Sequence, residues 1–175
     1  MRAFQRRGRK AVARLDADER AAIATLIAEV RALVGAAPLA IGEAGPQEAA
    51  VLRLFPDAVP TDPGISEEFR RLTESDLRSL KSGRLDAMLE DLGREEAEWV
   101  ISLDDALSVA AALTDVRLVV ATRLGLKTDE DADLLRGELD MAQGLLEEGL
   151  PEGLGVDQER LWFATVYQAL TWLQD

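Results

Sequence analysis

The stretch that follows Asp104 and Asp105 and reaches Leu124 constrains the fold more than any other segment, because it is apolar on most sides of a helix. A helix of this kind is stable in water only when other elements cover it. Asp104 or Asp105 is suited to begin the helix, and Gly125 is suited to end it. The sequence therefore predicts a central buried helix, whose apolar residues are Leu107, Val109, Leu113, Val116, Leu118, Val119, Val120 and Leu124.

Amphipathic helices are predicted before this segment. Asp16 and Glu19 have the spacing of a capping box, and the helix that they begin should end near Gly35. Pro46 suits the first turn of a short helix that runs through Leu54. The apolar face of the first helix consists of Ile23, Leu26, Ile27, Val30, Leu33 and Val34.

The region after Pro63 predicts two further helices. Ser66 begins one of them, and Thr73 with Asp76 resembles a second capping box that starts another helix ending at Leu92. The first should carry Phe69 and Leu72, and the buried face of the second should consist of Leu77, Leu80, Leu85, Met88, Leu89 and Leu92.

Two more helices follow the central one. Thr128 and Asp131 form a third capping box, before an acidic helix over residues 129–148, and Asp157 caps the last helix. Phe163, Val166, Leu170 and Leu173 should face the core from that last helix.

Residues 3–15 predict a β-hairpin, in which Arg7 and Gly8 supply the turn and Gly8 adopts a positive φ. The apolar run 99–103 predicts a short strand that pairs with this hairpin. The predicted fold class is mainly α, with five to seven helices around the central apolar helix and a small N-terminal sheet. We expect a single domain over residues 1–175, with a basic hairpin arm over 1–15 and a helical body over 16–175.

The composition argues against most enzyme classes. The chain contains neither cysteine nor histidine, which removes disulfides, thiolate chemistry, the usual general base and the commonest transition-metal ligands. Its glycines form neither a dinucleotide-binding fingerprint nor a phosphate-binding loop. We therefore expect no catalytic residues, no cofactor and no metal. No apolar run is long enough to span a bilayer, and no signal peptide is evident, so we expect a cytoplasmic protein.

The charge is divided unevenly along the chain. The net charge is −13, and the first 14 residues contain six bases and no acid, so the remaining residues carry −19. A surface of that sign repels the phosphates of nucleic acids. The basic residues that form the candidate contact with phosphate or with an acidic partner are Arg2, Arg6, Arg7, Arg9 and Lys10. The favoured interpretation of the arm is a solvated edge hairpin whose charges prevent strand-to-strand aggregation.

A helix-turn-helix within residues 66–92 is the other nucleic-acid hypothesis. Arg78, Lys81 and Arg84 recur on one side of a predicted helix, but acids flank them and no asparagine or glutamine is present there to read adenine. A salt-bridged surface helix is the favoured interpretation.

Residues 69–78, 113–125 and 166–174 together resemble an actinobacterial family that was long described as a domain of unknown function. Members are often described as the oxidative-stress transcriptional regulator AosR, and their genes lie near the ClpS adaptor and a cysteine-biosynthesis cluster. The resemblance implies a regulator that contacts the transcription machinery or a sigma factor. Its motif positions with an expected structural role are Asp76, Asp115, Arg117, Arg123 and Gly125. The chain departs from the family in lacking the cysteine pair of the proposed redox switch, so a disulfide switch is excluded here.

Candidate protein interfaces remain. Trp162 and Trp172 are the aromatic residues of the last helix that we expect at a partner or dimer contact, and Arg70 and Arg71 are further candidates. The acidic helix 129–148 either attracts a basic partner or is a solvated face. Our leading hypothesis is a regulatory protein-binding module. The alternatives are an adaptor or assembly factor for the neighbouring proteolysis and cysteine-biosynthesis proteins, and direct DNA binding through the arm.

Overall fold

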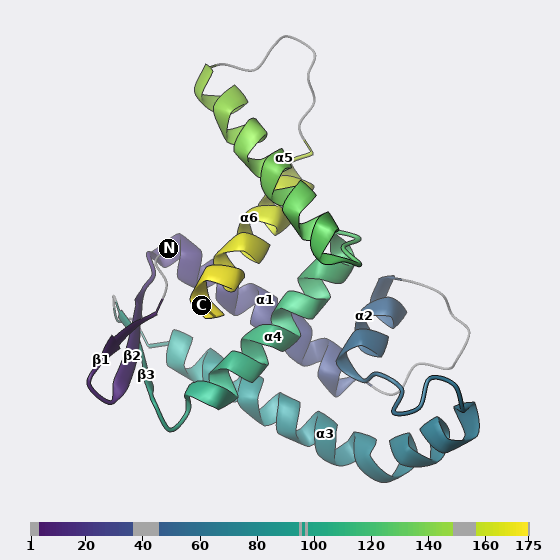
Figure 1. The fold of residues 1–175 in the computed structure, drawn as a ribbon. Coiled ribbons are helices and arrows are strands. Elements are labelled where there is room, and N and C mark those ends of the chain that lie inside the picture. Colours follow the sequence, from purple (N-terminus) through teal and green to yellow (C-terminus); the bar gives the residue numbers. More distant parts are fainter. Residues whose placement is uncertain (1–3, 37–45, 95, 97, 149–156, 175) are drawn as a thin grey trace.

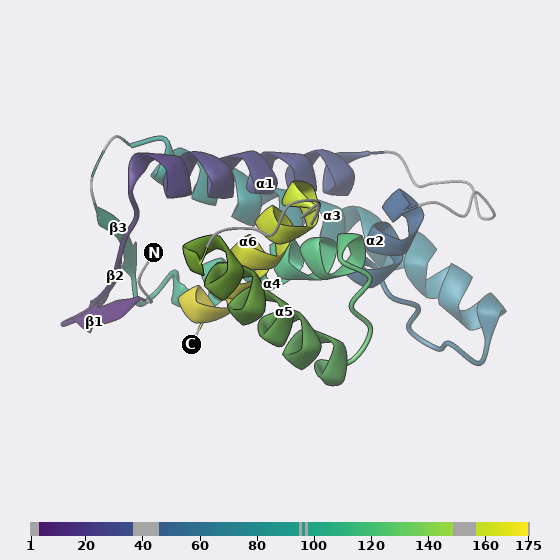
Figure 2. The same cartoon turned by 90° about the horizontal axis from the view of Figure 1, so that it is seen from above.

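The protein was studied as a computed structural model, which describes residues 4–36, 46–94, 96, 98–148 and 157–174. Over these residues the chain forms six helices and three short strands (Figure 1). The predicted fold class, a mainly helical chain with a small N-terminal sheet, is confirmed. The sheet lies at one end of the molecule, and α2 with the first turns of α3 lies at the other end (Figures 1 and 2).

Helix α4, Ala106–Arg123, is the central helix that the sequence predicts. It packs against α1 (Ala17–Gly35), α2 (Pro46–Leu54), α3 (Pro63–Leu92) and α6 (Gln158–Gln174). Gly125 follows it with a φ of 74°, a left-handed conformation that glycine adopts without strain. Its buried side chains are Val109, Ala112, Leu113, Asp115, Val116, Val119, Val120 and Ala121.

The sheet consists of β1 (Gln5–Arg7), β2 (Lys10–Arg14) and β3 (Glu98–Ser102), which are antiparallel and lie in that order. The hairpin turn lies one residue later than predicted, because Arg7 pairs with Lys10 and leaves Gly8 and Arg9 between the strands. Gly8 has a φ of 65°, which suits the first central position of a tight hairpin turn. The third strand joins β2 as expected and buries Trp99 against Phe4, with ring centroids 5.2 Å apart.

Helix α3 corrects the prediction of two helices starting at Ser66 and Thr73. It is continuous from Pro63, and the side chain of Asp62 accepts a hydrogen bond from the amide of Ile65 at 3.1 Å. The Thr73 hydroxyl donates to the Phe69 carbonyl one turn earlier at 2.8 Å, so it does not cap a new helix. A capping-box spacing marks a helix start only where the backbone leaves the helix, and nothing interrupts the backbone here.

The orientation of α3 also differs from the prediction. Leu85, Met88 and Leu92 are buried as expected, but Leu80 is exposed. Continuity explains this result, because one uninterrupted helix presents a single face to α1 and α4, and Leu80 falls on the opposite face. Phe69 and Leu72 lie on that outer face as well, and both are exposed.

Arginines from neighbouring elements cap the carboxyl ends of several helices. Neither α1 nor α3 has a base in its own last turn. Arg78 donates to the carbonyls of Val34 and Ala36, at 2.6 and 3.1 Å, at the end of α1. Arg20 of α1 reciprocates by donating to the Leu92 carbonyl, at 3.2 Å, at the end of α3. The carbonyls that end a helix lack partners within it and carry a partial negative charge, so each arginine supplies both donors and compensating charge.

A buried ion pair joins α3 to α4. The Lys81 ammonium lies 2.5 Å from Oδ1 of Asp115, and both side chains are largely excluded from solvent. Phe55 lies beside this pair, and the Arg78 guanidinium stacks over its ring with 4.3 Å to the centroid. Of the three bases predicted to lie on one side of this helix, Arg78 and Lys81 therefore contact groups within the fold.

Candidate functional site

A groove between α1 and α6 is the largely apolar cavity that we take as the candidate site. It has a volume of about 360 Å³. Leu139 of α5 (Asp129–Glu148) contributes to its lining. Helix α6 supplies one wall at helical spacing, from Trp162 through Val166 and Ala169 to Trp172. The groove therefore depends on the position of α6, which packs against α4 and α5 and has α1 on the other side of the groove.

Trp162 and Trp172 form the two ends of the α6 wall. They are 40% and 54% exposed, whereas Leu170 and Leu173 of the same helix are buried. Trp162 packs edge-on against Phe163, with ring centroids 4.9 Å apart and an interplanar angle of 74°. The inward and outward sides of α6 thus follow the sequence prediction, and exposed indoles beside an apolar floor are typical of protein interfaces.

The edge of the groove on the α1 side is acidic. Asp18 and Glu19 line it, and the described lining contains no lysine or arginine. Glu19 also completes the predicted capping box, because the Glu19 amide donates to Asp16 at 2.8 Å and the Asp16 amide donates to Glu19 at 3.0 Å. The two carboxylates lie in the first turn of α1, where the positive end of the helix dipole stabilises negative charge, so this edge of the groove is negative.

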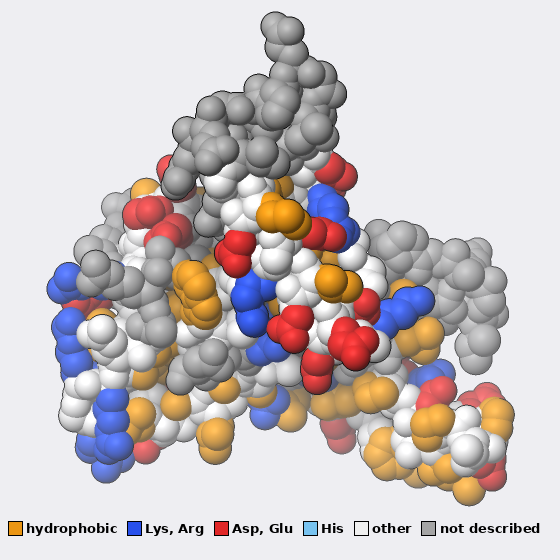
Figure 3. Space-filling view, turned by 45° about the horizontal axis from the view of Figure 1, so that its top comes forward, with side chains coloured by type: hydrophobic (Ala, Val, Ile, Leu, Met, Phe, Trp, Pro, Cys, Tyr) orange, Lys and Arg blue, Asp and Glu red, His pale blue; other side chains and the backbone are white. Residues whose placement is uncertain are grey.

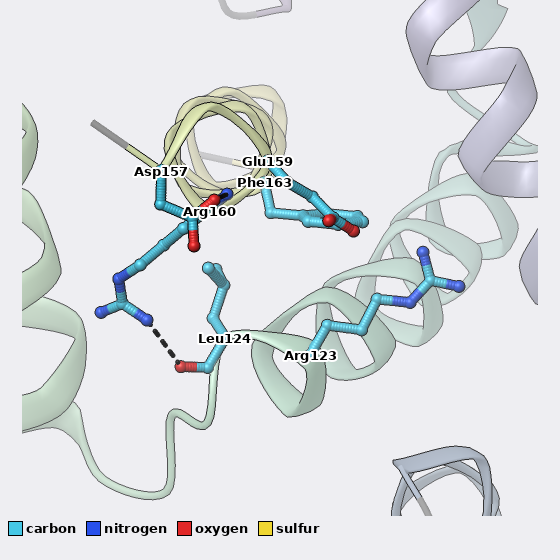
Figure 4. A pocket seen from close by; sticks show the side chains of 6 residues that line it. All are labelled: Arg123, Leu124, Asp157, Glu159, Arg160 and Phe163. Carbon is cyan, nitrogen blue, oxygen red and sulfur yellow. Dashed lines mark hydrogen bonds between the residues drawn. The ribbon is translucent and has the colours of Figure 1, made fainter. Parts of the chain in front are cut away.

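A second cavity lies where the end of α4 meets the start of α6 (Figure 4). It has a volume of about 380 Å³ and contains two arginines, which would be the groups to hold an anion. Both are already engaged, because Arg123 lies 2.6 Å from a Glu29 oxygen and Arg160 lies 2.9 Å from a Glu138 oxygen. Arg160 also donates to the Leu124 carbonyl at 3.4 Å. This cavity is a salt-bridged junction between helices.

Several bases of the arm form ion pairs with acids on the third strand and on the turn that follows it. Arg7 and Arg14 both lie 3.1 Å from Glu98, and Arg9 lies 3.1 Å from Asp104. The hydrogen bond from Arg14 lowers the pKa of Glu98, and Arg7 lowers it further.

The remaining bases of the arm have other surroundings. Arg6 donates to the Gly8 carbonyl at 3.2 Å, and Lys10 is exposed. Arg2 lies outside the described residues. Ion pairs thus reduce the positive charge that the described part of the arm offers to phosphate.

The other candidate interface residues lie away from the groove. Arg70 forms an ion pair with Asp57, and Arg71 forms a bidentate pair with Glu68 at 2.7 and 2.9 Å. These residues belong to the first turns of α3, at the end of the molecule opposite the sheet (Figure 1). The structure therefore does not bring the two arginines and the two tryptophans into one site.

The family-motif positions have separate structural surroundings. Asp115 pairs with Lys81, and the Arg117 guanidinium lies over the Tyr167 ring with 5.6 Å to the centroid. Asp76 is exposed on the outer face of α3, between Leu72 and Leu80.

The α1 side of the groove is the part that sequence reasoning missed. Asp18, Ala22 and Ile23 belong to a helix whose core face is evident from its spacing, but nothing in the sequence pairs that helix with α6. The only available signal was on α6, where residues 162, 166, 169 and 172 recur on one side of the helix.

The structure defines an acidic, mainly helical protein with a small sheet at one end and an aromatic groove along its last helix. The chain belongs to the family described as Domain of unknown function (DUF2017), which it matches over residues 1–175. No curated protein and no solved structure matches it. Among the described residues, no helix is both long and apolar enough to cross a bilayer, and no three acidic side chains are grouped to hold a metal ion.

Proposed function

We propose that this chain is a regulatory protein-binding module that holds a basic, apolar segment of a partner protein in the α1–α6 groove. The observation that supports this proposal best is the pair of exposed tryptophans beside an apolar floor and an acidic edge. Tryptophan is among the residues that contribute most to the binding free energy of protein interfaces. The acidic edge favours a partner segment that carries lysine or arginine.

The partner that we propose belongs to the transcription machinery, such as a polymerase subunit or a sigma factor. Two arguments support this choice, namely the resemblance to the AosR-type regulators and the charge of −19 that residues 15–175 carry. A strongly negative body repels nucleic acid and attracts basic protein surfaces, so regulation would act through protein contacts.

A pull-down from the native cell extract tests the proposal. Wild-type protein should recover a polymerase or sigma component, and a Trp162→Ala/Trp172→Ala variant should lose it. Each truncation at an interface hot spot costs about 2 kcal/mol, which weakens binding roughly thirtyfold. Leu134→Ala is the matched control, because Leu134 is an exposed apolar residue that does not line the groove.

The outcome of the pull-down also separates the alternatives. Recovery of proteolysis or cysteine-biosynthesis proteins, without polymerase, would replace the proposed partner with the adaptor hypothesis. Equal recovery by wild type and the tryptophan variant would reject the groove as the binding site. An Asp18→Asn variant should weaken binding at low salt more than at high salt, because the contribution of an exposed charge is screened.

A further inference from the structure

The outer face of α3 carries a second apolar surface, distinct from the groove. Ile65, Phe69, Leu72 and Leu80 are 54%, 52%, 61% and 51% exposed. Their spacing places them on one side of the helix, opposite the side that is buried in the core. Hydrophobic side chains gather visibly on the lobe that the first turns of α3 form, at the lower right of Figure 3.

An amphipathic helix normally has one apolar face, and that face is the buried one. Helix α3 has two, which makes its exposed face a candidate for contact with another molecule. We propose that this outer stripe, defined as Ile65, Phe69, Leu72 and Leu80, is the surface through which two copies of this chain form an antiparallel dimer. The inference uses a different surface from the proposed groove and does not depend on that function.

The low net charge of the outer stripe is compatible with a second copy as the occupant. The chain has a net charge of −13, so most pairs of surfaces on two copies repel one another. Residues 65–80 are almost neutral by comparison, with four acids and three bases and therefore a net charge of −1. The acidic helix α5, by comparison, carries eight acids and one base over residues 129–148. The outer stripe thus combines exposed apolar groups with almost no electrostatic penalty for self-association.

The spacing of the stripe fits two-fold symmetry. Ile65 and Leu80 lie at nearly equal distances along the helix on either side of Leu72. When two α3 helices cross antiparallel about an axis near Leu72, Ile65 faces Leu80 of the second copy and the two Leu72 side chains meet. The first turns of α3 lie at the end of the molecule remote from the sheet (Figure 2), which leaves room for the second body.

Sedimentation velocity over a range of concentrations, together with light scattering, tests the association. Wild type should dimerise, and the dimer should persist at high salt because salt screens the remaining repulsion. Leu72→Asp should weaken dimerisation roughly 100-fold, since it removes a buried leucine from each copy. Leu107→Asp is the control, because Leu107 is an exposed leucine on α4 outside the stripe. Circular dichroism verifies that both variants keep their helices.

Cysteine cross-linking tests the antiparallel register, and the natural chain contains no cysteine to interfere. Leu72→Cys should form a covalent dimer on mild oxidation, because the two Cβ atoms then approach within bonding range. Ile65→Cys alone should not cross-link, whereas Ile65→Cys/Leu80→Cys should. A monomeric wild type, or equal behaviour of Leu72→Asp and Leu107→Asp, would overturn the proposal. Cross-linking of Ile65→Cys alone would overturn the antiparallel arrangement.

Discussion

The α1–α3–α4 layer and the α5–α6 pair differ in how most of their charged residues are used. In the layer, Arg20 and Arg78 bind carbonyl ends of neighbouring helices, and Lys81 pairs with Asp115 inside the fold. In the second region, α5 projects from the body and packs mainly against α6, with most of its acids exposed (Figure 1). The comparison shows that charged side chains contribute to stability where they join one helix to another. Where they remain exposed, they contribute to the negative electrostatic potential around the protein.

The apolar groups divide differently, between the inside of the layer and the surfaces that face outward. The layer buries its large side chains around α4, whereas α6 and the outer face of α3 each leave large side chains exposed. Substitutions in the layer should therefore change the free energy of unfolding, and substitutions on the exposed surfaces should change association.

The largest expected effect in this comparison is at the ion pair inside the layer. Asp115→Ala leaves the Lys81 ammonium buried without its carboxylate and should lower the free energy of unfolding by about 3–5 kcal/mol. Urea denaturation followed by circular dichroism measures the change. Asp76→Ala on the exposed side of α3 is the control and should change it by less than about 0.5 kcal/mol. Similar values for the two variants would show that the pair does not tie the layer together.

The next effect concerns two adjacent leucines of α5. Leu135 is buried and Leu134 is exposed, although they are neighbours in the sequence. Leu135→Ala should cost about 2–5 kcal/mol, and Leu134→Ala should stay within about 0.5 kcal/mol. Thermal unfolding measured by calorimetry gives both numbers. A small effect at Leu135 would mean that α5 contributes little to the stability of the body. The two regions would then differ more in their contribution to the free energy of unfolding.

A smaller effect is expected from the arginine caps. Arg78→Ala removes the donors to the carbonyls at the end of α1 and should lower the free energy of unfolding by about 1.5–3 kcal/mol. Arg71→Ala, on the same helix, removes only an exposed pair with Glu68 and should cost about 0.5 kcal/mol or less. Chemical denaturation of both variants in the same buffer measures the two losses of unfolding free energy. Equal losses would argue against a capping role for Arg78.

Elements that depend on local residue patterns were predictable from the sequence. The capping boxes of Asp16 and Thr128 are present, and the amide of Arg160 donates to Asp157 at 3.0 Å. The buried character of α4 followed from its composition, because no amphipathic stripe could be found. Local signals decided these cases because the interacting groups lie within one helical turn of each other.

Features that depend on partners distant in the sequence were not predictable. Thr73 and Asp76 have the spacing of a capping box but lie inside α3, where tertiary packing keeps the helix continuous. The partner of Asp115 is Lys81, which lies 34 positions away, and no spacing rule connects them. The tryptophans of the candidate groove were found from α6 alone, but its acidic edge required the arrangement of α1 against α6.

The smallest expected effect is the pH dependence of the arm. Arg14 and Arg7 lower the pKa of Glu98 below its ordinary value of 4.5, so the folded chain holds this carboxylate ionised more readily than the unfolded chain does. Its contribution to stability is therefore complete above that ordinary value and is lost as the pH falls through the lowered pKa. Glu98→Gln should remove this contribution and reduce the slope of unfolding temperature against pH between about 5 and 3, while Glu68 and Asp131, whose pKa values are also lowered, keep part of it. Asp104→Asn, which affects a fully exposed pair with Arg9, should leave most of the slope intact. An unchanged slope in Glu98→Gln would show that the arm's ion pairs do not distinguish the folded state from the unfolded one.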